Sequence, residues 1–130
     1  MLLFGHRFIP SESFYHIDSI EAIKNTPPSS TLYLLFSENN LDIVKHAKEN
    51  SIAFMLSVQN ITELIYASSL DAKFILVPKE LAKTAQDIAE SYLFDAKILT
   101  KIEKESEIEE MALLGLDGLL FTNAIIKITD

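Results

Sequence analysis

The fold is decided by the stretch Leu70-Asp71-Ala72-Lys73-Phe74-Ile75-Leu76-Val77-Pro78. It consists of a polar turn, a short apolar run and a proline that ends the run. The apolar residues do not alternate with polar ones, as they would in a strand that has one face in water. We therefore predict a β-strand that is buried on both faces, as strands in parallel sheets are.

Two later stretches repeat this pattern, namely Phe94-Asp95-Ala96-Lys97-Ile98-Leu99 and Leu116-Asp117-Gly118-Leu119-Leu120-Phe121. In each, an apolar residue, an aspartate and a small residue precede the apolar run, which is typical of a helix that passes into a parallel strand. Strand starts are predicted near residues 32, 53, 74, 97 and 118, with a spacing of about 21 residues. This spacing leaves room for one strand and one right-handed crossover helix per step.

Helix starts are indicated by polar residues followed three positions later by an acid, which is the capping-box pattern. It occurs at Asp18-Ser19-Ile20-Glu21, Asn60-Ile61-Thr62-Glu63 and Ser106-Glu107-Ile108-Glu109. A helix capped by Asn39 and a long helix over Lys79–Tyr92 complete the predicted set. Short apolar runs at Met1–Phe4, Phe14–Ile17 and Ala124–Ile128 are candidates for additional strands.

These elements predict an α/β fold for residues 1–130, as a single three-layer domain with a mainly parallel sheet of five or six strands. Two forms of the sheet remain open at this point: a flavodoxin-like open sheet with helices on both faces, and a half-barrel-like sheet. The chain has 130 residues. This length is too short for eight βα units, so a complete eightfold barrel is excluded.

The turns Leu70-Asp71-Ala72-Lys73 and Leu116-Asp117-Gly118-Leu119 resemble the helix-to-strand turns of phosphate-binding (βα)-barrels. The resemblance covers these turns and the βα rhythm from about Thr31 to Asn123, and it implies a fold without implying a particular reaction. The full chain also resembles small bacterial α/β proteins, and that resemblance supplies no activity.

The composition excludes several classes of protein. The formal net charge is −8 and the pI is about 4.8, and no cluster of Lys and Arg offsets it, so we expect no binding to nucleic acid or to anionic membranes. The absence of cysteine excludes disulfides and thiolate sites. No apolar run approaches the roughly 20 residues of a membrane helix, and the start of the chain lacks the pattern of a signal peptide. We expect a cytoplasmic protein.

Candidate binding residues are those that follow the predicted strands, because ligands of α/β sheets bind at the carboxyl ends of the strands. Arg7, the only arginine, follows the first strand beside Gly5 and His6, and a guanidinium suits bidentate contact with a carboxylate or phosphate. The alternative is a surface ion pair of Arg7 with an acid such as Asp18 or Glu38. The predicted ligand-binding set is His6, Arg7, Ser57, Asn60, Lys79 and Asn123.

Other kinds of site find little support. The three glycines form neither a P-loop nor a dinucleotide-binding loop, and Ser57 and Asn60 serve equally well as simple helix caps. The three histidines do not have the spacing of metal ligands, so we predict no metal and no cofactor. A phosphoacceptor receiver domain is rejected, since no paired aspartates follow the first regular strand.

Lysine chemistry is a further alternative. Lys79 and Lys101 follow predicted strands, where barrel aldolases place an imine-forming lysine, and such a residue needs burial or a cationic neighbour to lower its pKa. Lys101 is followed by Glu103 and Lys104, which indicates a solvated side chain.

Two functional hypotheses follow. The first is a non-catalytic module that binds a protein partner or itself, for example as a homodimer. It rests on the strongly apolar runs Met1–Phe4 and Leu119–Ile128, because an apolar outer strand must be covered. The alternative is a protein that binds a small anion or phosphometabolite, or a minimal enzyme, with its site at the carboxyl ends of the strands.

Overall fold

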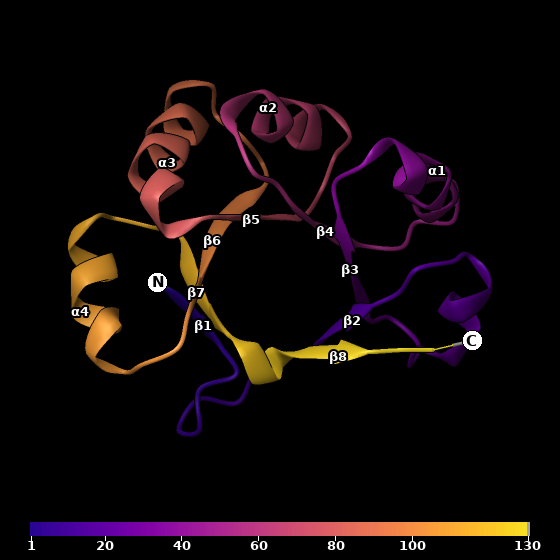
Figure 1. Ribbon diagram of the computed structural model, residues 1–130, viewed down its shortest axis with the longest axis horizontal. Coiled ribbons are helices and arrows are strands. Elements are labelled where there is room, and N and C mark those ends of the chain that lie inside the picture. The colour runs from indigo at the N-terminus through magenta and orange to yellow at the C-terminus, as the bar shows by residue number, and fades with distance from the viewer. Residues whose placement is uncertain (130) are drawn as a thin grey trace.

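The sheet has eight strands, and all neighbouring strands are parallel. In the computed structural model, which describes residues 1–129, the strands are β1 (Leu2–Phe4), β2 (Phe14–His16), β3 (Thr31–Leu35), β4 (Phe54–Ser57), β5 (Phe74–Val77), β6 (Lys97–Ile102), β7 (Gly118–Phe121) and β8 (Ile125–Lys127). Their order in the sheet is β1-β7-β6-β5-β4-β3-β2-β8. The sheet curls strongly, so that its strands surround a common interior (Figure 1).

The α-helices lie on the outer side of the curled sheet (Figure 1). They are α1 (Leu41–Glu49), α2 (Ile61–Ser69), α3 (Ala82–Ser91) and α4 (Ser106–Leu113). Short 3-10 turns occur at η1 (Glu21–Asn25), η2 (Glu38–Asn40), η3 (Lys79–Leu81) and η4 (Thr122–Ala124). None of the helices in residues 1–129 combines the length and the hydropathy that crossing a membrane would require.

This arrangement confirms the α/β class, the parallel sheet and the half-barrel-like alternative. The open three-layer alternative is not found, because no α-helix covers the inner face of the sheet. The prediction of five or six strands was wrong, since the sheet has eight. The count was too low because β1, β2 and β8 have only three residues each. Runs this short form strands only when they pair with neighbouring strands that are distant in the sequence.

The two ends of the sheet come together. Only η4 separates β7 from β8, yet β7 pairs with β1 while β8 pairs with β2. Gly118 allows the close approach of β1, because a Cβ atom there would lie 2.9 Å from the Leu2 Cβ and 2.7 Å from the Leu99 Cδ2. The segment from β7 through η4 to β8 therefore connects the two ends of the curled sheet, while β1 and β8 remain its two outermost strands.

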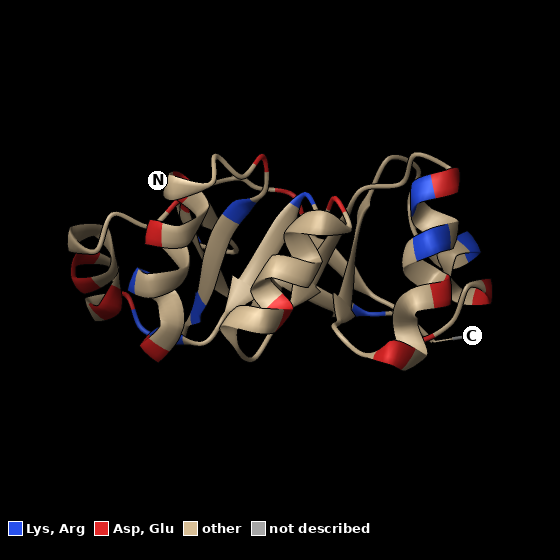
Figure 2. Cartoon of the chain, turned by 90° about the horizontal axis from the view of Figure 1, so that it is seen from above, with Lys and Arg blue, Asp and Glu red and all other residues tan. Residues whose placement is uncertain are grey.

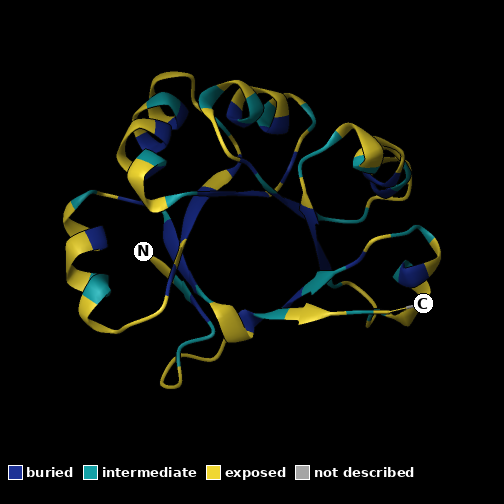
Figure 3. Ribbon diagram, in the orientation of Figure 1, coloured by how far each residue is buried: buried dark blue, intermediate teal, exposed yellow. Residues whose placement is uncertain are grey.

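Large side chains fill the interior of the curled sheet. The rings of Phe4, Phe14 and Phe74 pack edge to face, with centroid distances of 5.0 Å, 5.5 Å and 5.4 Å. The same cluster contains Tyr33, Met55, Leu76, Leu99, Leu120 and Ala124. The interior is thus a packed core and not a channel, and strands β3, β4, β5 and β7 are mostly buried, whereas β8 is largely exposed (Figure 3).

A second core lies between the outer face of the sheet and the helices. It includes Leu34, Leu56, Leu64, Ile75, Ala85 and Ile98. The prediction from the non-alternating run is confirmed, because all four residues of β5 are buried between the two cores.

All four α-helices end in the same kind of turn. The second residue beyond each helix has a positive φ, and these residues are Ser51, Asp71, Leu93 and Gly115. After α1, α2 and α3 the next amide closes the turn on a helical carbonyl, for example Ile52 N on Ala47 O at 2.8 Å and Phe94 N on Ala89 O at 2.8 Å. The predicted helix-to-strand turns are therefore present, although only Asp71 among the three repeated aspartates occupies the left-handed position.

Of the predicted capping boxes, only the one at Asn60 forms as expected. Asn60 does cap α2, since Glu63 N donates to Asn60 Oδ1 at 2.9 Å and Glu63 Oε1 accepts from Gln59 N at 2.9 Å. The box at Ser106 was wrong: α4 has no side-chain cap of that kind. The segment that begins at Asp18 forms the 3-10 turn η1, in which Ala22 N donates to Ser19 Oγ.

Candidate functional site

A pocket with a volume of about 300 Å³ opens at the carboxyl ends of β3, β4, β5 and β6. Its lining consists of Tyr33, residues 57–59, residues 76–80, Thr100 and Lys101. We call it the mouth pocket. It lies where parallel α/β sheets bind ligands, because each strand ends there and the chain turns away toward a helix.

Three polar side chains lie above the apolar interior at this pocket. Tyr33 is itself part of the interior cluster, and Ser57 and Lys101 follow the interior residues Met55 and Leu99 by two positions. Residues two apart in a strand share a face. Tyr33, Ser57 and Lys101 therefore belong to the inner face of the sheet at its carboxyl end.

These three side chains have no polar partner within residues 1–129: Lys101 Nζ makes no ion pair, and neither hydroxyl makes a hydrogen bond. Tyr33 is only 7% exposed. Every fully buried side-chain nitrogen or oxygen in the described chain has a partner, so the unpartnered Tyr33 hydroxyl is not fully buried, and Tyr33 lines the pocket. A hydroxyl in such a position needs a hydrogen-bond partner from outside the chain.

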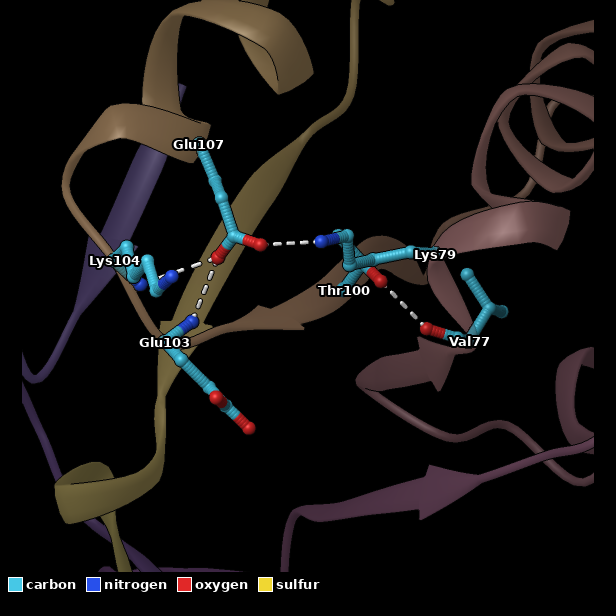
Figure 4. A network of polar contacts seen from close by, with 6 residues as sticks. All are labelled: Val77, Lys79, Thr100, Glu103, Lys104 and Glu107. Carbon is cyan, nitrogen blue, oxygen red and sulfur yellow. Dashed lines mark hydrogen bonds and ion pairs between the residues drawn. The ribbon is translucent and has the colours of Figure 1, made fainter.

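Two other lining residues are already engaged (Figure 4). The Lys79 ammonium donates to Glu107 Oε1, and Thr100 Oγ1 donates to Val77 O at 2.7 Å. The bond to Glu107 raises the pKa of Lys79. An imine-forming lysine needs the opposite shift, so this environment does not suit Lys79 to that chemistry.

Glu107 gathers several donors at the start of α4 (Figure 4). Its Oε2 accepts from Glu103 N at 2.8 Å and from Lys104 N at 3.1 Å, while its Oε1 accepts from Lys79. The hydrogen bond from Lys79, followed by the two backbone bonds, lowers the pKa of Glu107 to about 2. The Glu107 carboxylate thus occupies the place where these donors could otherwise bind an anion from outside the chain.

His6 and Arg7 bind the same acid. His6 Nε2 lies 3.0 Å and Arg7 Nε 3.1 Å from Glu105 Oε1, and His6 Nδ1 accepts from Phe8 N. The bond from Arg7 is the main reason why the pKa of Glu105 is lowered. Of the two predicted outcomes for Arg7, this geometry corresponds to the surface ion pair, with Glu105 in place of Asp18 or Glu38.

Of the six predicted ligand-binding residues, Ser57 and Lys79 line the mouth pocket. His6 and Arg7 hold the loop after β1 to the start of α4. Asn60 caps α2, and Asn123 lies in η4, where its Oδ1 would be 2.9 Å from a Cβ atom placed on Gly5. The structure therefore brings together two of the six at this pocket.

Tyr33 was not predicted as a site residue, and Lys101 was considered only for lysine chemistry. The available signal was the two-residue alternation within each strand, which relates Lys101 to Leu99 and Ser57 to Met55. It could be applied only after the inner face of the sheet was known.

Three other hollows, of about 510, 440 and 350 Å³, lie beside the turns that lead into the strands or beside α3. Their polar side chains mainly bond to the chain. Asp117 Oδ2 accepts from Ile98 N and Gln86 Oε1 accepts from Asp117 N, both at 2.9 Å, while Ser30 donates to Pro27 O. In the hollow of about 440 Å³, the side chains of Ser68, Lys73 and Tyr92 also have no hydrogen bond or ion pair within residues 1–129, but this hollow contains the acids Asp71 and Asp95 and does not lie at the carboxyl ends of the strands.

The charged residues of the described chain do not form a large cluster of one sign. Acidic side chains are distributed over the helices and loops, with lysines between them (Figure 2). Within residues 1–129 no three His, Asp or Glu side chains are grouped as a metal ion would require.

The apolar runs at the two ends of the chain are buried in part, since Met1, Leu2 and Ile126 remain exposed. Phe4, Leu119, Leu120 and Ala124 belong to the two cores. The main reason to expect self-association was that these runs needed cover, and the pairing of β1 with β7 and of β2 with β8 provides part of it. A homodimer stays a prediction.

Comparison with known proteins adds no identification, because no protein-family model and no curated protein matches the chain. Function is therefore inferred from the mouth pocket.

Proposed function

We propose that this protein binds a small organic anion in the mouth pocket and that Lys101 supplies the charge that holds it. The observation that carries this proposal is the position of Lys101, Tyr33 and Ser57, which line one pocket without polar partners inside the described chain. Each of the three can donate a hydrogen bond. Together they match the acceptor capacity of one anionic group.

The energetics favour an anion at this place. Hydrogen bonds between charged groups contribute about 1.5–3 kcal/mol, roughly twice the value for neutral pairs. The buried side chains of Leu76 and Tyr33 line the pocket together with Lys101. Lys79 contributes less, because Glu107 already neutralises it.

The proposal is a binding role without a chemical step. No nucleophile paired with a base was found in the sequence, and Lys101 is exposed. The protein-interaction module remains the alternative prediction, and the two differ in a measurable way, because only the small-anion role depends on the charge of Lys101.

The test is a thermal-shift and calorimetric screen of the purified protein against organic carboxylates and phosphates, with Lys101→Met in parallel. Saturation at about 100 times Kd adds roughly 2.7 kcal/mol to the free energy of unfolding. Lys97→Met is the matched control, because Lys97 begins the same strand and lacks an ion pair within residues 1–129. It changes the net charge equally at the opposite end of β6.

We expect at least one anion to raise the unfolding temperature, with Kd at least about tenfold weaker in Lys101→Met and unchanged in Lys97→Met. If both variants bind the anion equally, the site is not the mouth pocket. If no anion shifts the unfolding of the wild-type protein at millimolar concentration, the proposal fails.

A further inference from the structure

We infer that the ligand of the mouth pocket is a monocarboxylate with a small apolar body, and not a phosphorylated compound. This inference rests on the proposed function, since it specifies which anion the pocket accepts. It is carried by three features of the pocket: its occupied backbone amides, its charge and its apolar wall.

The first feature concerns the amides where a phosphate would bind. Phosphate groups are commonly held by free backbone N–H groups at the starts of helices that follow strands. At two of the turns beside this pocket such donors are taken by the chain's own carboxylates: Gln59 N donates to Glu63, and Glu103 N and Lys104 N donate to Glu107. A phosphate at either of these turns would have to displace a glutamate.

The second feature is the charge around the pocket. Among its lining residues Lys101 is the cation without an acidic partner in the described chain, Lys79 is paired with Glu107, and Glu80 is acidic. A single free lysine balances a monoanion. Lys101 would neutralise one charge of a dianion, and the second negative charge would lie near the carboxylates of Glu80, Glu63 and Glu107. Like charges repel at short range.

The third feature is the wall of the pocket. Tyr33, Leu76 and Pro78 line it, and Leu35 pairs with Ser57 in the sheet while remaining 49% exposed. Leu35 follows Tyr33 by two residues and so lies on the same face. The apolar surfaces of Tyr33, Leu76 and Pro78 suit contact with an apolar ligand body, Leu35 lies outside the pocket lining, and a volume of about 300 Å³ is at the lower end for ligand pockets.

The experiment compares matched probes by calorimetry at neutral pH. Benzoate, phenylacetate and hexanoate are each paired with the phosphonate of the same body. Benzamide tests the need for charge, and acetate tests the need for an apolar body. We expect at least one of the three carboxylates to bind at least about tenfold more tightly than its matched phosphonate and than acetate. If that carboxylate is benzoate, it should also bind at least about tenfold more tightly than benzamide. The affinity should be lost in Lys101→Met.

A second variant tests the occupied amides directly. Glu107→Ala removes the carboxylate that holds Glu103 N, Lys104 N and Lys79, so we expect it to gain binding of inorganic phosphate by at least about tenfold. Glu109→Ala is the matched control, because Glu109 is an exposed residue of α4 without a polar side-chain partner in residues 1–129. It should gain nothing.

The outcomes separate the inference from the function on which it rests. Phosphonates that bind as tightly as carboxylates, through Lys101, would overturn the inference and leave the small-anion function standing. An equal affinity for benzoate and acetate, with the other carboxylates no tighter, would overturn the requirement for an apolar body. The absence of any binding that depends on Lys101 would overturn both.

Discussion

The two sides of the curled sheet are built differently. On the side formed by β3 to β6 the strands have four to six residues and α-helices connect them. On the closing side, formed by β1, β2, β7 and β8, three strands have three residues each, and only loops and 3-10 turns connect β1 to β3 and β7 to β8. The regular side is held by helices packed on its outer face, whereas the closing side depends on its inner aromatic rings.

The largest effect is expected from Phe14→Ala, which removes the ring that joins the closing side to the interior. Phe14 is fully buried and contacts the rings of Phe4 and Phe74. Truncation of a buried phenylalanine costs about 3–5 kcal/mol. Urea denaturation followed by circular dichroism should therefore show a loss of that size in the free energy of unfolding, in one cooperative transition.

Phe54→Ala is the matched variant on the regular side, because Phe54 is equally buried but packs in the outer core. Leu113→Ala, at an exposed residue of α4, should stay within about 0.5 kcal/mol of the wild type. If Phe14→Ala costs less than about 1 kcal/mol while Phe54→Ala costs several, the closing side is a loosely attached segment and the two sides do not fold as one unit.

A smaller effect is expected on the regular side from Asn60→Ala. The variant leaves Glu63 N without the Asn60 Oδ1 atom that accepts its hydrogen bond at 2.9 Å. Loss of such a cap costs about 0.5–2 kcal/mol, which denaturation can resolve. Asn39→Ala is the control, because Asn39 is exposed and has no polar side-chain partner within residues 1–129. An equal loss in both variants would show that the hydrogen bond is not the cause.

The regular side was the part that the sequence could predict. Its strands are continuous apolar runs, and its turns repeat at even spacing, so local pattern and final structure agree. The turns themselves were less predictable in detail. Leu93 holds a left-handed conformation, φ 55°, that usually selects glycine or asparagine, and only the fixed spacing between helix and strand explains its presence there.

The closing side could not be predicted in the same way. A strand of three residues contains too little pattern to show which neighbour it pairs with, and β1 pairs with β7 across most of the chain length. The apolar runs at the two ends were recognised as requiring cover. β1 pairs with β7 of the other run, whereas β8 pairs with β2, and these pairings are properties of the curled sheet and not of either run.

The candidate site was predicted in part for the same reason. The sequence directed the search to the carboxyl ends of the strands, and Ser57 and Lys79 line the pocket that lies there. Arg7 and His6 drew attention because they are rare residue types in this chain, yet they bind Glu105. The Lys101 side chain was predicted to be solvated because Glu103 and Lys104 follow it in the sequence. Its position on the inner face of the sheet follows instead from its spacing of two residues from Leu99.

The smallest effect is expected from two acids at the start of α4. Glu107 connects this turn to Lys79 on the regular side, and Glu105 connects it to Arg7 on the closing side. The pKa of Glu107 is lowered to about 2 from its ordinary value of 4.5, chiefly by Lys79, and the pKa of Glu105 is lowered chiefly by Arg7. A carboxylate with a lowered pKa stabilises the fold above its ordinary pKa and loses that contribution as the pH falls.

Glu107→Gln should therefore flatten the fall in the free energy of unfolding between about pH 4.5 and pH 2, the two pKa limits of Glu107, while the stability near neutral pH falls slightly. Glu105→Gln should flatten the same interval less, because Glu105 accepts no backbone hydrogen bond within residues 1–129, whereas Glu107 accepts two. Urea denaturation at a series of acidic pH values measures both slopes. If the slope of the unfolding free energy against pH changed more in Glu105→Gln than in Glu107→Gln, the ion pair to Arg7 on the closing side would contribute more stability than the ion pair to Lys79 on the regular side. The division between a helix-supported side and a dependent closing side would then be wrong.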